Sequence, residues 1–131
     1  MRFVLLIVSL LVLSSSARAA APDWNNAHPI EVKLSNFHFT PDMIQLKHGE
    51  AYRLHLVNEA NGGHNFDAAA FFAAAQIASM DQAKLNHGVV ELKKGEAVDV
   101  RFVAPMPGSY KLHCSHFLHS SFGMTGQIIV L

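Results

Sequence analysis

Short segments in which apolar and polar residues alternate recur along most of the chain. Residues 52–56 are typical, because Tyr52, Leu54 and Leu56 would share one face of an extended strand. The same alternation, or a short apolar run bounded by turn residues, predicts further strands at 30–34, 43–46, 89–92, 98–102, 110–112 and 126–131. A succession of short strands with turns between them is typical of a β-sandwich or a barrel.

Turn residues separate several of these segments. Lys94-Gly95-Glu96 lies between the strands expected at 89–92 and 98–102, so we expect these two strands to pair with each other. His48-Gly49-Glu50 and the run from Pro105 to Gly108 mark two further breaks. No internal repeat or long linker divides the chain, and the pattern predicts one all-β sandwich.

One stretch departs from the strand pattern. Residues 67–80 are rich in alanine, the best helix former, and Asp67 is a residue type that caps helix N-termini. Phe71, Ala75 and Ala78 would lie on one face of such a helix. We therefore expect one short helix inserted between strands, where it covers a sheet edge or an open end of the core.

The first nineteen residues have the order of a secretory signal peptide. A basic start is followed by an apolar run over residues 3–13 and then by small residues, with Ala17 and Ala19 at the positions that precede a cut. The apolar run is about half of the roughly 20 residues that a membrane span needs. We expect a signal peptide at 1–19 and an exported, periplasmic protein with no membrane span, whose single domain covers residues 20–131.

Composition and charge limit the kinds of molecule expected as a partner. The chain of 131 residues has ten Lys and Arg against ten Asp and Glu. Loss of Arg2 and Arg18 with the signal peptide would leave eight cationic residues against ten anionic ones, a net charge near −2 with neutral histidines. Because no basic stripe is present, we do not expect nucleic acid as a partner.

Cys114 is the only cysteine of the chain, although cysteines of exported proteins usually pair. It is followed by an imidazole at His119 and a thioether at Met124, each five residues further on. Thiolate, imidazole and thioether are the soft and borderline ligands that suit copper. A second imidazole, His64, stands upstream in Gly62-Gly63-His64-Asn65. Two His, one Cys and a weak axial Met make a type 1 copper site, so we expect these four residues to hold one copper ion.

These motifs give the chain a specific resemblance to the cupredoxins, the small copper proteins that include plastocyanin, azurin and pseudoazurin. Three features match the end segment of the family: Gly108-Ser109-Tyr110 before His113-Cys114, the later His119, and Met124-Thr125-Gly126 before a terminal strand. Gly63-His64-Asn65 is a second match. The resemblance implies a Greek-key β-sandwich.

The resemblance also implies a role for each matched residue. His64, Cys114 and His119 would be the equatorial ligands, and Met124 the axial one. Asn65 would tie the two ligand-bearing segments together by hydrogen bonds, with Ser115 as its partner. The Cys-to-His spacing is azurin-like, whereas the His-to-Met spacing is one residue longer, as in plastocyanin.

Two functions remain open at this stage. The first is single-electron transfer by Cu(II)/Cu(I) cycling, with a transient redox partner such as a cytochrome or a copper enzyme. The alternative is a periplasmic copper-tolerance protein that sequesters or oxidises excess copper. An enzyme is not expected, because multicopper oxidases use His-x-His pairs from partner domains and this chain has only His-x-x-His.

Further histidines and apolar residues surround the expected site. The chain has nine histidines, and those at 38, 55 and 113 are expected to be partly exposed. Two interpretations stay open: surface imidazoles, or a second, weaker copper site formed by some of His38, His55, His113 and His116. Phe117, Leu118 and Phe122 either pack within the loop or form an apolar docking patch around His119, of the small size that transient redox encounters use. We expect a monomer.

Overall fold

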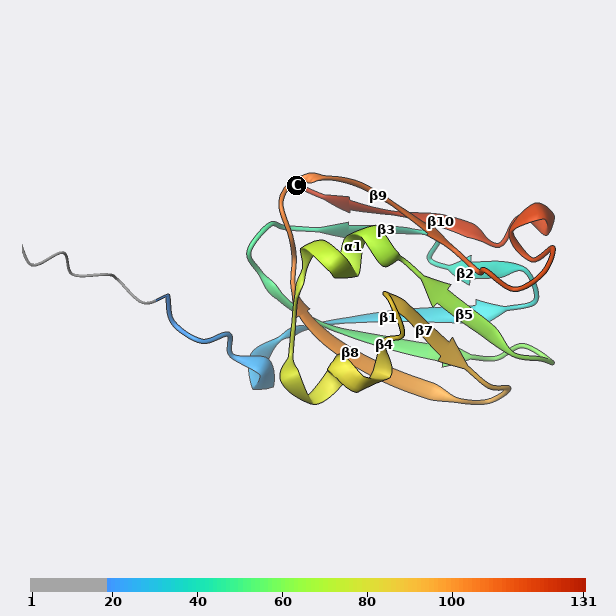
Figure 1. The fold of residues 1–131 in the computed structure, drawn as a ribbon, viewed down its shortest axis with the longest axis horizontal. Helices are drawn as coiled ribbons and strands as arrows, with labels where there is room; N and C mark the ends of the chain where they lie inside the picture. The colour runs from blue at the N-terminus through green and yellow to red at the C-terminus, as the bar shows by residue number, and fades with distance from the viewer. Residues whose placement is uncertain (1–18) are drawn as a thin grey trace, which may run out of the picture.

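The computed structural model describes residues 19–131 as two β-sheets that face each other, with three short 3₁₀ segments and one α-helix (Figure 1). The expected signal peptide therefore lies outside the described residues, apart from Ala19. Within 19–131, none of the helices has the length and hydropathy needed to cross a bilayer.

The first sheet has the strand order β2-β1-β4-β8-β6. Its strands are β1 (His28–Ser35), β2 (His38–Thr40), β4 (Ala51–Asn58), β6 (Gln76–Ile77) and β8 (Ala97–Val103). β1 and β4 run parallel, and the other pairs are antiparallel. In β4, Tyr52, Leu54 and Leu56 are buried, which is the alternation expected from the sequence.

The second sheet has the order β3-β10-β9-β5-β7 and carries the residues of the expected copper site at one end. Its strands are β3 (Met43–Leu46), β5 (His64–Asp67), β7 (Val89–Leu92), β9 (Gly108–His113) and β10 (Thr125–Val130). β10 pairs parallel with β3 and antiparallel with β9. The connection from β9 to β10 lies at the opposite end of the sandwich from the C-terminus (Figure 1).

The core lies between the two sheets. Side chains from the inner faces of both sheets and from the helix form one continuous buried cluster, whose largest fully buried members include Phe66, Phe71, Phe102, Leu34, Leu56 and Leu112. Aromatic rings cross the layer edge to face, as where the ring of Phe71 meets those of Phe102 and Tyr110. The expected β-sandwich with one short helix is confirmed.

The helix is shorter than the alanine pattern predicts, and the expected cap is wrong. α1 covers only Ala69–Ala74, its N-cap is Ala68 without a side-chain hydrogen bond, and Asp67 belongs to β5. Beyond the helix, β6 pairs with β8, and the N–H of Ala78 donates to the carbonyl of Arg101. A 3₁₀ segment, η2 (Ser79–Lys84), follows. Pairing with an open sheet edge therefore overrides the helix propensity of alanine.

The expected pairing of the strands around Lys94-Gly95-Glu96 is also wrong. β7 pairs with β5 in the second sheet, whereas β8 pairs with β4 and β6 in the first. The side-chain amide of Asn58 is buried at this crossing and donates to the carbonyls of Gly62, Leu92 and Lys93. A turn that passes between sheets has the same local sequence signals as a hairpin turn, so the pattern alone does not separate the two.

Candidate metal centre

The four expected ligands come from two segments at one end of the second sheet. His64 is the first residue of β5, and Cys114 follows the last residue of β9. His119 and Met124 lie on the connection that leads to β10. Asp67 of β5 stands opposite His113 of β9, so the two strands bring His64 and Cys114 into the same region although fifty residues separate them.

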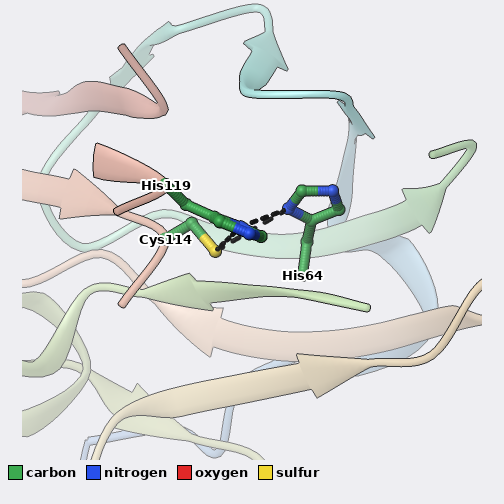
Figure 2. A group of neighbouring side chains, drawn as sticks. All are labelled: His64, Cys114 and His119. Atoms are coloured by element: carbon green, nitrogen blue, oxygen red, sulfur yellow. Dashed lines mark hydrogen bonds between the residues drawn. The ribbon is translucent and has the colours of Figure 1, made fainter. Parts of the chain in front are cut away.

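Three donor atoms converge at this point (Figure 2). The Nδ1 atoms of His64 and His119 are 3.0 Å apart. The Sγ atom of Cys114 lies 3.3 Å from Nδ1 of His119 and 3.8 Å from Nδ1 of His64. Within residues 19–131, these three residues form the one group of three or more His, Cys, Asp or Glu side chains that is close enough to share a metal ion.

The size and chemistry of this triangle fit a transition metal. A point equidistant from the three atoms lies about 2 Å from each, close to the roughly 2.0–2.1 Å and 2.3 Å that zinc keeps from His nitrogen and Cys sulfur. One thiolate and two imidazoles are the donor set of a trigonal copper site with a weak axial ligand. The residues present therefore fit one copper ion.

Cys114 and His64 are both buried, and burial shifts the pKa of each side chain. Cys114 has no exposed surface, and burial raises the pKa of its thiol, while the N–H of Asn65, which donates to Sγ over 3.4 Å, counteracts that effect. A buried thiolate therefore needs a cation to compensate its charge. Burial also lowers the pKa of His64, and the neighbouring His119 adds to this effect, so the imidazole stays neutral, as a metal ligand must be.

Met124 is fully buried and joined to the cluster through its backbone. Its carbonyl accepts a hydrogen bond from the N–H of Cys114, and its own N–H donates to the carbonyl of His119. The loop turns back through η3 (Ser120–Phe122) and Gly123, whose φ of 98° is left-handed and suits glycine. The loop thus folds back over the cluster and brings the thioether residue beside the two loop donors.

Asn65 and Ser115 connect the two donor segments. The side-chain oxygen of Asn65 accepts from the N–H of Ser115 over 2.8 Å, and its amide group donates to the hydroxyl of Ser115 over 2.8 Å. Asn65 thus fixes the residue after His64 against the residue after Cys114. This contact holds the two segments in register without touching the donor atoms of the imidazoles.

A family model of the cupredoxin-like domain matches residues 2–130. The chain belongs to the cupredoxin-like family. No curated protein sequence matches this cupredoxin.

Solved structures share its fold. Auracyanin B is 24% identical, with a TM-score of 0.59 over 86% of this chain and 91% of its own. The reduced auracyanin of the photosynthetic bacterium Roseiflexus castenholzii is 18% identical, with a TM-score of 0.59 over 80% of this chain and 98% of its own. The McoA multicopper oxidase of Aquifex aeolicus is 16% identical, with a TM-score of 0.63, and matches 87% of this cupredoxin but 31% of the oxidase.

Phe37, to which the sequence pattern assigns no role, covers the donor cluster. It lies in the turn between β1 and β2 with a left-handed φ of 64°. Its ring stands edge-on to the rings of His119 and His64, at centroid distances of 5.2 and 6.4 Å, and packs against Phe122 at 5.3 Å. A bulky residue with positive φ is uncommon, but a sequence does not reveal its backbone angles.

Glu91 is a second residue of the site that the sequence pattern does not reveal. It stands opposite Asn65 in the pairing of β7 with β5. One of its carboxylate oxygens accepts from the side-chain amide of Asn65 over 3.2 Å, and the other lies 2.5 Å from Nε2 of His116. In the sequence Glu91 is the polar member of an alternating strand, a pattern that does not distinguish it from any surface glutamate.

The remaining histidines of interest lie outside the donor cluster. His38 is exposed on β2, and His55 of β4 pairs with Asp99 of β8 over 2.6 Å. His113 is half-buried, with Nε2 3.5 Å from the carboxylate of Asp67. His116 faces Glu91 instead of joining the three donors.

The apolar side chains of the ligand loop face outward. Phe117 is 87% exposed and Phe122 63% exposed, and Leu118 is also exposed. These three residues border His119, whose own side chain is half-buried. They therefore form an exposed apolar patch on the loop that carries the candidate ligands.

Proposed function

We propose that this cupredoxin is a type 1 copper protein that carries single electrons between redox proteins outside the cytoplasm, and that it is not an enzyme. The observation that supports it best is the closed triangle of Nδ1 of His64, Nδ1 of His119 and Sγ of Cys114. The fully buried Met124 supplies a thioether for the axial position. When bound, copper supplies one-electron chemistry by alternating between Cu(II) and Cu(I).

The side chains around the triangle suit that role. Asn65 and Ser115 hold the two ligand segments in one arrangement, and Phe37 shields the imidazoles on the side of the β1–β2 turn. A rigid frame suits electron transfer, because Cu(I) and Cu(II) prefer different geometries and a fixed compromise limits rearrangement. His119 is half-buried and lies next to the exposed patch, so it offers a route from the centre to a partner, which we propose docks transiently at Phe117, Leu118 and Phe122.

The decisive experiment is addition of one equivalent of Cu(II) to the metal-free protein. We expect an intense thiolate-to-copper absorption band in the visible range that disappears on reduction and returns on reoxidation. Cys114→Ser should lose the band while the far-UV circular dichroism of a β-sandwich stays. A Cys114→Ser protein with the same colour would contradict the assignment.

Copper tolerance is the second candidate, because two histidines beside the cluster each face a carboxylate: His113 with Asp67 and His116 with Glu91. These pairs could collect copper beyond one ion per chain. Fast, reversible electron exchange with a cytochrome in stopped-flow mixing supports the carrier. Two tightly retained ions per chain with slow exchange support copper handling.

Export is part of the proposal and has its own test. Expression of the whole 131-residue chain in a bacterial host, followed by N-terminal sequencing of the periplasmic protein, should give a chain that begins at Ala20. Ala19→Leu should block processing, because a large residue next to the cut is not accepted. Recovery of the full chain in the cytoplasm would overturn the export proposal and leave the copper assignment untouched.

A further inference from the structure

Glu91 connects the two segments that carry the donor atoms. Its backbone lies on β7, where the neighbouring Val90 and Leu92 are buried, so its side chain stands on the outer face of the strand. Its two carboxylate oxygens have different partners: the amide group of Asn65 and Nε2 of His116. Asn65 follows His64, and His116 follows Cys114 by two positions. One carboxylate therefore bridges both donor segments.

His116 occupies the space between this carboxylate and the donor cluster. Its ring lies nearly parallel to that of His64, with an interplanar angle of 12° and a centroid distance of 6.3 Å, and lies 5.3 Å from the ring of His119. Because a carboxylate only accepts hydrogen bonds, the contact at 2.5 Å requires His116 to donate from Nε2. The contact thus fixes the orientation of a ring that neighbours both imidazole donors.

The charge of Glu91 also reaches the donor atoms. Burial is the main cause of the raised pKa of Cys114. The negative charge of Glu91 acts in the same direction, because it disfavours negative charge on the sulfur. It favours positive charge at His64, against the stronger effect of burial there. A fixed negative charge beside a metal site stabilises the more highly charged oxidation state of the metal.

We propose that Glu91 and His116 form a positioning pair that fixes the Cys114–His119 loop against β5 and β7 and lowers the reduction potential of the copper centre. The inference rests on the proposed copper function for its effect on the potential. The positioning effect belongs to the protein itself and is measurable without metal. The two effects share one origin, because a carboxylate held in one place by two donors presents its charge at a fixed position.

The test compares Glu91→Gln, His116→Gln and the double variant with the wild type. Gln has nearly the shape of Glu without its charge, so Glu91→Gln should shift the midpoint potential upward in voltammetry at pH 8. The matched control is Asp99→Asn, which neutralises the carboxylate of another His–carboxylate pair, His55–Asp99, in the opposite sheet. The control should leave the potential at the wild-type value.

Urea unfolding of the four metal-free proteins measures positioning. Each single variant should lower the midpoint of unfolding, and the double variant should lose less than the two single losses combined, because each substitution alone already weakens the same contact. Additive losses, or a potential for Glu91→Gln that moves no more than the Asp99→Asn control, would overturn the proposal. If the wild type binds no copper, the proposed function fails, while the metal-free unfolding cycle still decides whether the pair positions the loop.

Discussion

Asn65 and Ser115 hold each other by two hydrogen bonds of 2.8 Å, one through the backbone N–H of Ser115 and one through its hydroxyl. Ser115→Ala removes the hydroxyl bond and keeps the bond to the backbone N–H. The contact between the two donor segments can therefore be weakened in two separate steps.

Asn65→Ala should cost more than Ser115→Ala. Asn65→Ala removes both bonds and the bond to Glu91, and it leaves the N–H of Ser115 without its partner, which we expect to lower the free energy of unfolding by about 1–3 kcal/mol. Ser115→Ala keeps the backbone bond and should cost about 0.5–1.5 kcal/mol. Urea unfolding of the metal-free proteins measures both values. Equal losses in the two variants would mean that neither the bond to the backbone N–H nor the bond to Glu91 contributes to stability.

Met124 should tune the potential according to the hardness of its side chain. Met124→Gln offers an oxygen donor that favours Cu(II), so the midpoint potential should fall. Met124→Leu removes the donor and should raise the potential, and because the side chain is fully buried and similar in volume, the fold should lose less than about 1.5 kcal/mol. Voltammetry of the copper-loaded variants checks both directions. Wild-type potentials in both would remove Met124 from the set of axial ligands.

Asp81 gives the stability of the sandwich a defined pH dependence. Burial acts to raise the pKa of this carboxyl, but hydrogen bonds and ion pairs with Lys84 and Arg101 outweigh it, so that the pKa is lowered below its ordinary 3.8. The stabilisation is therefore present above the unfolded-state pKa near 3.9 and is lost as the pH falls through the lower, folded-state pKa. Asp81→Asn should lower the free energy of unfolding by about 1–3 kcal/mol at pH 7.

The difference between wild type and Asp81→Asn should shrink below about pH 4, because the carboxyl then becomes protonated in the unfolded chain while the folded protein still holds it ionised. Thermal unfolding of the metal-free proteins across pH 3 to 7 measures this difference. A gap that stays constant down to pH 3 would show that the loss in Asp81→Asn comes from packing and not from charge.

We expect one tightly bound copper per chain after Cu(II) titration and desalting. A second ion at His113 or His116 should bind weakly, and more weakly still in acid, because protons compete with a metal ion for imidazole nitrogen. Metal analysis at pH 7.5 and 5.5 measures the stoichiometry. Two retained ions at pH 7.5, reduced to one in the His113→Ala, His116→Ala double variant, would favour copper tolerance over electron transfer.

Much of the fold and the donor cluster is visible in the sequence, because both depend on local patterns. The alternation at Tyr52, Leu54 and Leu56 defines a strand by its side-chain period alone. The spacing of Cys114 and His119 places two donors on one short loop.

Features that depend on distant partners were not predictable in the same way. Glu91 and Phe37 reach the site only because β7 pairs with β5 and the β1–β2 turn folds over His119. The early end of α1 likewise depends on the free edge of β8, which accepts Gln76 and Ile77 as a strand. In each case the deciding neighbour lies many residues away in the chain.

The position of β10 in the chain determines when the donor cluster can form during synthesis and export. All five strands of the first sheet precede residue 104. In the second sheet, β3 pairs with β10, and β9 pairs with β5 at a single pair of residues. A chain emerging from the ribosome or the export channel thus carries the thiol of Cys114 while the strand that encloses it is still missing. Residues 125–130 close the second sheet after its other strands have appeared, and they bring the four side chains together in one enclosed centre.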